Sequence, residues 1–288
     1  MKSAPFDYVE AGSAEEAVHL IGEAGSDGAI LAGGQTLMPL LALRVASPAV
    51  LVDINPAADM AGISESGSGL RVAARTRQAH ARKDPLVARC LPLMVEALGH
   101  VGHFQTRTRG TIGGSIALGE PAAEMPALAV ALGATIELRS LRGTRMVPAR
   151  EFYVGPYTTV RADDEVLVAV HYPAWPDGTR TLFEEVARRQ GDFALVGLLG
   201  AIAVDAGRIA RAGLAWFGMG PTPIAAQAVE QALVGTAPGD VDVAELTRVA
   251  LGEVAPGDDL HASEQYRRIV AARVFARKMR ALLAEFAA

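Results

Sequence analysis

The chain has 288 residues, of which 50% are hydrophobic, and this suits one large domain or two packed domains without stabilising cross-links. Lysine and arginine number 27 against 32 aspartates and glutamates, and the formal net charge of -5 argues against nucleic acid or an anionic membrane as a partner. The single cysteine, Cys90, excludes an intrachain disulfide framework and the cysteine set of an iron–sulfur cluster, so any redox centre must be organic or belong to another chain.

The N-terminal part of the chain has the pattern of a small β-α-β unit. Residues 1–13 lack the apolar segment of a secretion signal, so we expect the protein to stay in the cytoplasm. Ser13 and Glu16 form a capping box at the start of a helix that ends at Gly25. A short apolar run then enters a Gly-Gly turn, and residues 50–54, between two prolines, are predicted to form a buried strand.

The middle of the chain is predicted to contain one long helix and several strands. Residues 69–78 have strand character, and residues 84–102 are predicted to form a helix with Asp84 as its cap. Residues 110–159 are interpreted as rich in strands, and a further strand is expected at 165–172.

Residues 173–180 have two prolines, an Asp-Gly pair and no periodicity, so we place a domain boundary there. Up to three strands are expected in residues 183–219, with residues 205–207 as a hairpin turn. The apolar run 193–204 is too short to span a bilayer and predicts a buried strand. Two or three helices follow, the last beginning at Ser263. These elements together predict an α+β fold.

Two glycine pairs stand out, in residues 32–37, AGGQTL, and in residues 110–115, GTIGGS. Paired glycines permit positive φ angles and let backbone N–H groups approach a ligand closely, as a nest for a pyrophosphate requires. The hydroxyl groups of Thr36, Thr111 and Ser115 would add donors. Each loop taken alone is more simply an ordinary turn. Neither matches the dinucleotide-binding GxGxxG sequence or the GxxxxGK sequence of a P-loop.

Charged residues near the second loop are open to two interpretations. Arg107 and Arg109 would offset the charge of a pyrophosphate or would lie at a solvated loop edge. His100 and His103 have the spacing of half a metal site but lack a second pair, which favours a packing role. The charged residues within 184–189 are interpreted as a solvated face.

Taken together, the motifs resemble one family. Residues 105–115, QTRTRGTIGGS, resemble the second flavin loop of the FAD subunits of molybdenum hydroxylases, and residues 32–37 resemble the first. The spacing of the loops, the strand at 50–54 and residues 188–194, RRQGDFA, are also similar to this family, which includes the medium subunit of carbon monoxide dehydrogenase and the FAD domain of xanthine dehydrogenase. The resemblance covers essentially the whole chain.

The resemblance implies an α+β fold of two domains. Residues 1–175 would form an FAD-binding domain of the vanillyl-alcohol-oxidase (PCMH) type, with subdomains at 1–56 and 57–175. Residues 176–288 would form a smaller α+β domain with an antiparallel sheet and helices, of the carbon monoxide dehydrogenase flavoprotein type.

The resemblance also implies a set of FAD contacts. Backbone N–H groups of residues 32–36 and 111–115 would hold the cofactor, Glu124 would contact its hydroxyl groups, Leu167 would lie near the flavin, and Phe193 would lie against the isoalloxazine. Ser115 stands where many family members carry asparagine, and Phe193 where some carry tyrosine. The implied cofactor-binding residues are Ala32, Gly33, Gly34, Gln35, Thr36, Leu37, Thr111, Ile112, Gly113, Gly114, Ser115, Glu124, Leu167 and Phe193.

The function implied is electron transfer rather than primary catalysis. FAD in this chain would take electrons from 2Fe–2S clusters of a small partner subunit, which relay them from a molybdopterin centre in a large partner subunit, and the three chains would assemble as a dimer of heterotrimers. No catalytic or metal-binding residue is expected in this chain itself. The alternatives are a self-sufficient flavin-dependent oxidase or reductase of the same fold and a non-catalytic nucleotide-binding scaffold. The primary substrate and the final electron acceptor leave no signal in this sequence.

Overall fold

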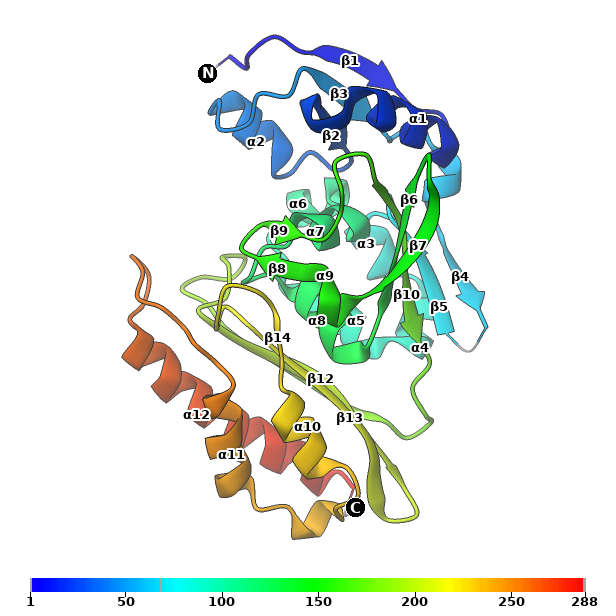
Figure 1. The fold of residues 1–288 in the computed structure, drawn as a ribbon. Coiled ribbons are helices and arrows are strands. Elements are labelled where there is room, and N and C mark those ends of the chain that lie inside the picture. The colour runs from blue at the N-terminus through cyan, green and yellow to red at the C-terminus, as the bar shows by residue number, and fades with distance from the viewer. Residues whose placement is uncertain (1, 68, 287–288) are drawn as a thin grey trace.

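The computed structural model describes residues 2–67 and 69–286. Within this part of the chain, three sheets of three or more strands follow one another in sequence, together with one two-stranded ribbon (Figure 1). Their strand orders are β1-β3-β2, β4-β5-β10-β6-β7, β11-β12-β13-β14 and β8-β9. Helices pack against the sheets, and the predicted α+β fold is confirmed.

The elements have the following bounds. The strands are β1 (Asp7–Glu10), β2 (Gly28–Leu31), β3 (Val50–Asp53), β4 (Ile63–Ser66), β5 (Gly69–Ala73), β6 (Thr135–Ser140), β7 (Gly143–Pro148), β8 (Tyr153–Gly155), β9 (Thr158–Thr159), β10 (Val166–Pro173), β11 (Arg180–Val186), β12 (Val196–Asp205), β13 (Arg208–Phe217) and β14 (Ile224–Ala225). The α-helices are α1 (Ala14–Ala24), α2 (Leu37–Ala42), α3 (Gln78–Ala81), α4 (Pro85–Cys90), α5 (Pro92–His100), α6 (Phe104–Arg109), α7 (Ile112–Leu118), α8 (Glu124–Leu132), α9 (Ala149–Phe152), α10 (Gln227–Leu233), α11 (Val243–Gly252) and α12 (Glu264–Ala284). Short 3-10 helices are η1 (Gly25–Asp27), η2 (Ala58–Met60) and η3 (Pro238–Asp240). No helix among the described residues is long and apolar enough to cross a membrane.

The first sheet is parallel and confirms the predicted β-α-β unit. β3 lies between β1 and β2, and α1 joins these two outer strands while packing against β3. Ser13 caps α1 as predicted, since its hydroxyl oxygen accepts from the Glu16 N–H at 3.1 Å. The returning bond is displaced by one residue, because the Glu16 carboxylate accepts from the N–H of Gly12 at 2.7 Å.

The predicted helix at 84–102 is divided into α4 and α5, which corrects the single long helix. Asp84 caps α4 by accepting from the N–H groups of the second and third helical residues, as its position indicated. The break falls at Leu91, whose φ of -138° is extended. Pro92 follows it, and proline disfavours a helical conformation in the residue before it while fitting the first position of the next helix.

Residues 112–132 are mostly helical, which corrects the prediction of a strand-rich segment from 110 onward. α7 begins directly after Thr111, and every residue of α8 is buried. A helix that is apolar on all sides has no period that distinguishes it from a buried strand. The strand prediction is confirmed from β6 onward and for β10, the central strand of the second sheet.

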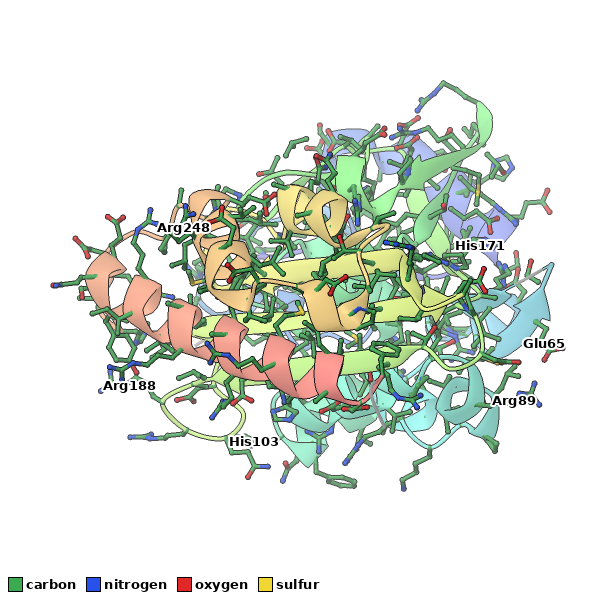
Figure 2. All side chains as sticks on the ribbon, turned by 90° about the horizontal axis from the view of Figure 1, so that it is seen from below. Glu65, Arg89, His103, His171, Arg188 and Arg248 are labelled. Carbon is green, nitrogen blue, oxygen red and sulfur yellow. The ribbon has the colours of Figure 1, made fainter. Side chains whose placement is uncertain are left out.

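The third sheet lies between α8 on one face and α10, α11 and α12 on the other (Figure 1). Figure 2 shows α12 lying over this sheet. β12 and β13 form the predicted hairpin, and the turn residues Ala206 and Gly207 have φ of 47° and 76°, as a type I′ turn requires. Trp216 of β13 stacks on Phe275 of α12 with ring centroids 6.0 Å apart. These helices therefore share a core with one face of the third sheet.

Candidate functional site

A cavity of about 550 Å³ lies between the first sheet, α7 and the loop that joins β11 to β12. Its volume is within the usual range for small-molecule and cofactor sites. All predicted site residues except Ile112 line this cavity, namely Ala32, Gly33, Gly34, Gln35, Thr36, Leu37, Thr111, Gly113, Gly114, Ser115, Glu124, Leu167 and Phe193. The fold therefore brings together segments that are more than half the chain apart in sequence.

Ile112 has a different position from the other residues of its loop. Its side chain is fully buried in the main hydrophobic core, and its N–H donates to the carbonyl of Thr76 at 2.9 Å. Gly113 likewise lies against the backbone of Ala74, to whose carbonyl it donates at 2.8 Å. These two residues anchor the second loop to the end of β5.

The first glycine loop presents a row of backbone donors. Among the described residues, the backbone N–H groups of residues 32–36 donate no hydrogen bond within the protein. Gly34 has a φ of 70°, the left-handed conformation that glycine adopts without strain. Successive free N–H groups in such a turn form a concave nest that attracts an anion. This loop has the donor pattern that its sequence predicted.

The second loop differs from its prediction in how its amides are used. The N–H groups of Ile112 and Gly113 bond to the end of β5, that of Gly114 donates to Thr111 Oγ1 at 3.0 Å, and that of Ser115 donates to the Thr111 carbonyl at 3.2 Å. The loop is the first turn of α7, so these amides are engaged within the protein. Of the five predicted amide donors at 111–115, only that of Thr111 has no acceptor among the described residues.

A polar bridge that the sequence analysis missed joins the two loops. Asn55, just after β3, donates from Nδ2 to the carbonyl of Ala32 at 2.9 Å. The Arg77 guanidinium donates both to the Asn55 side-chain oxygen and to the carbonyl of Arg109, which precedes the second loop. Gly33 lies so close to this point that a Cβ there would stand 2.6 Å from the Arg109 carbonyl oxygen. The bridge and the close approach together set the distance between the loops.

Glu124 is a buried carboxyl in the cavity wall, at the first position of α8. Only 5% of the surface of this residue is exposed. Burial, and to a smaller extent the negative charge of Glu185, raise the pKa of Glu124 to about 8, against the opposing influence of the Arg107 charge. A carboxyl in this state exchanges hydrogen bonds readily with the hydroxyl groups of a ligand.

Leu167 and Phe193 contribute apolar surface. Leu167 is buried in β10 at a β-bulge, and Phe193 lies in the loop before β12 with 61% of its surface exposed. A large exposed aromatic ring on a cavity rim is available for stacking on a planar ligand. Leu167 therefore offers a ligand a buried, fixed apolar surface, and Phe193 offers it an exposed one.

Several further residues line the cavity without having been predicted. Gln78 is buried, and its Oε1 has no hydrogen-bond partner in the part of the chain that the structure describes. Glu120 accepts from the hydroxyl of Tyr157, and Arg161 is partly desolvated, which lowers its pKa. No motif or spacing in the sequence singles out these three residues, because only the tertiary fold brings their segments to the cavity.

Arg107 and the histidine pair have structural roles. Arg107 donates to the carbonyls of Val101 and Gly102, at 2.7 and 2.9 Å, and so braces its own loop. His100 faces Glu185 rather than His103. Within the described part of the chain, no group of three or more His, Cys, Asp or Glu residues is arranged to hold a metal ion.

The raised pKa of Glu124 predicts a pH-dependent stability for the ligand-free chain. The unfolded state releases this proton near the ordinary pKa of 4.5, whereas the folded state keeps it until the pH reaches about 8. The free energy of unfolding should therefore fall as the pH rises from 4.5 to about 8. The limiting slope from one such group is roughly 1.4 kcal/mol per pH unit. Urea denaturation at several pH values should give a shallower decline for Glu124→Gln than for the wild type. Equal slopes would show that Glu124 does not keep the proton.

Two family models match consecutive parts of the chain. A model described as the FAD binding domain in molybdopterin dehydrogenase matches residues 4–175. A model described as the CO dehydrogenase flavoprotein C-terminal domain matches residues 181–282.

Individual proteins are similar over almost the full length. The carbon monoxide dehydrogenase medium chain of Hydrogenophaga pseudoflava is 34% identical over 98% of each chain. Subunit alpha of the 6-hydroxypseudooxynicotine dehydrogenase complex of Paenarthrobacter nicotinovorans is 37% identical over 93% of this chain and 90% of that one. Among solved structures, the carbon monoxide dehydrogenase of H. pseudoflava superposes with a TM-score of 0.94 at 35% identity over 99% of both chains. Quinoline 2-oxidoreductase of Pseudomonas putida 86 gives a TM-score of 0.91 at 34% identity over 99% of both chains.

Proposed function

Because the chain belongs to the family of FAD-binding subunits of molybdopterin dehydrogenases, we propose that its FAD occupies the cavity between the two glycine loops and there passes electrons from partner iron–sulfur clusters to an external acceptor. The chain is the flavoprotein component of an oxidoreductase with several subunits. Iron–sulfur clusters and molybdopterin belong to other subunits of such enzymes.

The row of unpaired N–H groups in the first loop is the observation that carries the assignment of FAD to this cavity. A pyrophosphate is an anion that needs several donors, and the N–H groups of residues 32–36 are free to supply them. The N–H of Thr111 lies on the opposing loop, and Gly114 beside it is exposed and carries no side chain. The residues of the cavity thus fit a dinucleotide.

The remaining contacts that we propose follow the chemistry of the cavity wall. Glu124 would exchange hydrogen bonds with hydroxyl groups of the cofactor, while Leu167 and Phe193 would hold the flavin ring by apolar contact. When bound, FAD supplies the redox chemistry, and the chain supplies binding, orientation and electrostatics. The asymmetry between the loops supports residues 32–36 as the main phosphate-binding segment.

Phe193→Ala is expected to weaken FAD binding by roughly 2- to 10-fold, because an aromatic pair contributes about 0.5–1.5 kcal/mol beyond area burial. The midpoint of unfolding without FAD should not change, since the ring is largely exposed. Equilibrium dialysis measures the affinity, urea denaturation of the FAD-free protein measures the midpoint, and the visible absorbance spectrum of bound FAD reports the surroundings of the flavin ring. An unchanged affinity together with an unchanged flavin spectrum would place the ring away from the cofactor.

We propose domains at residues 1–175 and 176–288, with subdomains at 1–56 and 57–175. The strands of the first sheet lie within residues 7–53, those of the second within 63–173, and those of the third within 180–225. The proposed boundaries thus pass between sheets and cut none of them. The gap between the two matching family models, at residues 176–180, supports the same division.

The immediate partners that we propose are a small iron–sulfur subunit and a large molybdopterin subunit, assembled as a dimer of heterotrimers. The single cysteine of this chain supports the assignment of the clusters to another subunit. A stable assembly of this kind would bury more than about 1,000 Å² at each contact. Phe193 is exposed on the cavity rim, which supports an opening of the cavity at the surface of this chain, where a partner subunit would bind.

Co-expression with the two partner subunits tests the proposal. We expect a complex that contains FAD, iron and molybdenum, and a flavin absorbance that bleaches on addition of the primary substrate. The isolated chain should bind FAD and show no such bleaching. Turnover of an organic substrate by the isolated chain would instead support a self-sufficient flavoenzyme, and failure of the isolated chain and of the complex to take up FAD would overturn the assignment of the cavity.

A further inference from the structure

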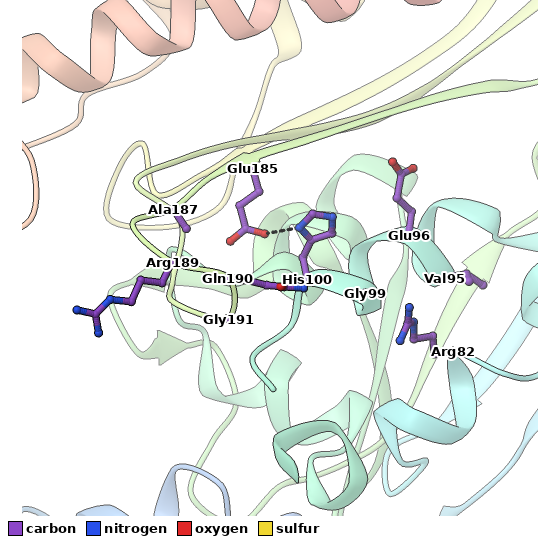
Figure 3. Close-up of a pocket in the computed structure, with 10 residues that line it drawn as sticks. All are labelled: Arg82, Val95, Glu96, Gly99, His100, Glu185, Ala187, Arg189, Gln190 and Gly191. Carbon is purple, nitrogen blue, oxygen red and sulfur yellow. Dashed lines mark ion pairs between the residues drawn. The ribbon is translucent and has the colours of Figure 1, made fainter. Parts of the chain in front are cut away.

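The loop between β11 and β12, residues 187–195, carries Phe193 to the rim of the cavity assigned to FAD. We call it the Phe193 loop. Residues 187 and 189–191 of this loop also line a neighbouring cavity of about 580 Å³ (Figure 3). Because 61% of Phe193 is exposed, packing of its own side chain does little to hold the ring. The position of the ring therefore depends on how the backbone of the loop is fixed.

The first half of the Phe193 loop rests on the end of α5 and the start of α6. A Cβ on Gly191, whose φ is 89°, would stand 2.5 Å from the ring of His103. Just before the loop, Glu185 of β11 has its Oε2 3.5 Å from His100 Nδ1, and only 5% of the Glu185 side chain is exposed (Figure 3). This burial corrects the interpretation of residues 184–189 as a wholly solvated face, although the two arginines of that stretch are exposed.

The second half of the loop is held at its backbone by Arg267 of α12. Leu195 closes the loop, because its N–H donates to the carbonyl of Val186 at 2.8 Å. The carbonyl of Leu195 accepts from Arg267 Nη1 at 2.5 Å. Ala194, which separates Phe193 from Leu195, is itself buried. The guanidinium of Arg267 therefore holds the chain close to the point where the aromatic ring leaves it.

The same guanidinium holds a second backbone segment against the loop. Its Nη1 also donates to the carbonyl of Gly218, directly after β13, at 2.9 Å. Gly218 has a φ of 70°, and a Cβ there would stand 2.6 Å from the carbonyl oxygen of Ala194, so this close approach requires glycine. The N–H of Gly218 donates to the carbonyl of Pro121 at 2.9 Å. Pro121 adjoins Glu120, which lines the FAD cavity, so Gly218 joins the loop to another part of the cavity wall.

The surroundings of Arg267 are those of a fixed connection rather than of a mobile surface charge. Only 7% of its side chain is exposed, and its Nη2 donates to Asp259 Oδ2 at 2.6 Å. The other carboxylate oxygen of Asp259 accepts from the N–H groups of His261 and Ala262, at 2.7 and 2.9 Å. Burial of a charge is costly unless hydrogen bonds compensate it, and the planar guanidinium binds several acceptors in set directions. Arg267 thus ties the start of α12 rigidly to the Phe193 loop.

We propose that Arg267 is a positioning residue for FAD, which fixes the Phe193 loop through the carbonyls of Leu195 and Gly218 so that the aromatic ring meets the flavin. This inference rests on the proposed position of FAD. Arg267 is absent from the described residues that line the cavity, so it acts through Phe193 and not by contact with the cofactor. Loss of the guanidinium should therefore cost no more FAD affinity than loss of the aromatic ring.

A double-mutant cycle, measured by isothermal titration of the FAD-free full-length chain with FAD, tests this role. Arg267→Met removes the guanidinium and keeps a long, unbranched side chain. It should weaken FAD binding by roughly 2- to 10-fold, the range expected for Phe193→Ala. In the Phe193→Ala background the same change should cause no measurable further loss, because residues that act as one unit have non-additive effects. The visible absorbance spectrum of bound FAD should shift in the same direction in Arg267→Met as in Phe193→Ala.

The matched control is Arg268→Met, at the next position of α12. The guanidinium of Arg268 also donates to backbone carbonyls, those of Leu251 at 3.2 Å and Val254 at 3.3 Å, and to the carboxylate of Glu264 at 2.7 Å. These bonds hold α12 to the end of α11 and not to the Phe193 loop. Arg268→Met should therefore lower the unfolding midpoint, as Arg267→Met does, but keep the FAD affinity and the flavin spectrum of the wild type.

Trypsin reports on the loop directly, because Arg188 and Arg189 are exposed within it. In FAD-free Arg267→Met, cleavage after these arginines should become several-fold faster relative to cleavage at other sites, since the loop has lost its anchor. Arg268→Met should show no such local change. If Arg267→Met does not fold, Arg267→Lys takes its place in every measurement, because an ammonium group lacks the planar fork that engages both carbonyls and Asp259 at once.

Three results would overturn the positioning role. They are wild-type FAD affinity, a wild-type flavin spectrum, and a further loss of affinity in the Phe193→Ala background as large as the loss in the wild-type background. In the last case the guanidinium would act on binding by a route that does not include the ring. Failure of the wild-type chain to bind FAD would instead overturn the proposed function.

Discussion

Gly33→Ala is expected to weaken FAD binding by roughly 100-fold while the chain remains folded. A Cβ at this position would stand 2.6 Å from the carbonyl oxygen of Arg109 and 2.9 Å from the Cα of Gly110. Both are backbone atoms, so the clash is relieved only if the two loops move apart. That movement withdraws N–H groups of residues 32–36 from the phosphates, and hydrogen bonds to charged groups contribute about 1.5–3 kcal/mol each.

Isothermal titration of the FAD-free protein with FAD measures this loss. Gly257→Ala is the matched control, because a Cβ there meets no atom within 4 Å and the same change of residue type is made in an exposed loop. Gly33→Ala should remain folded without FAD but with a lowered unfolding midpoint, because moving the loops apart strains the bridge through Asn55 and Arg77. If Gly33→Ala binds FAD as tightly as the control, the distance between the loops does not limit binding.

Gly113→Ala is expected to destabilise the fold by roughly 3 kcal/mol, whereas the adjacent Gly114→Ala should leave stability nearly unchanged. A Cβ on Gly113 would stand 2.5 Å from the Ala74 Cβ and 2.6 Å from its Cα, in the core beneath α7. Overpacking against such rigid atoms costs about 1–3 kcal/mol or more. A Cβ on Gly114 meets only the Thr111 hydroxyl at close range, 2.7 Å away. The cost of the weakened cap, about 1 kcal/mol, is offset by the similar gain in helix propensity.

The two variants therefore separate the structural role of one glycine from the binding role of the other. Urea denaturation should show the lower stability of Gly113→Ala, and FAD titration should show weaker binding by Gly114→Ala, whose new methyl group lies in the cavity wall. Similar stabilities for the two variants would mean that the backbone at Gly113 shifts away from Ala74 and makes room for the new methyl group. Such a result would contradict the close packing of α7 on the end of β5.

Local patterns in the sequence were sufficient for the elements whose causes are local. The caps at Ser13 and Asp84, the hairpin turn at 205–207 and the strand at 165–172 each depend on a few neighbouring residues, and each is confirmed. Where burial on all sides removes the period, as in α8, the sequence pattern gave the wrong element. The break at Pro92 was visible in the sequence, but the apolar residues on either side of it continued the helical pattern.

The two glycine loops were the main sequence evidence for the site. The structure determined which of their backbone amides are available to a ligand. The sequence by itself determined that the chain has two close-approach loops and no thiolate set for a cluster, because glycine and cysteine report directly on backbone freedom and on ligand chemistry. Only the tertiary structure decided that the amides of residues 112–115 are engaged within the protein while those of 32–36 are free. It also decided that Asn55 and Arg77 bridge the loops and that Glu124 and Glu185 are buried. The physical reason is that hydrogen-bond satisfaction and desolvation depend on which distant segments pack together, and no short stretch of sequence records that.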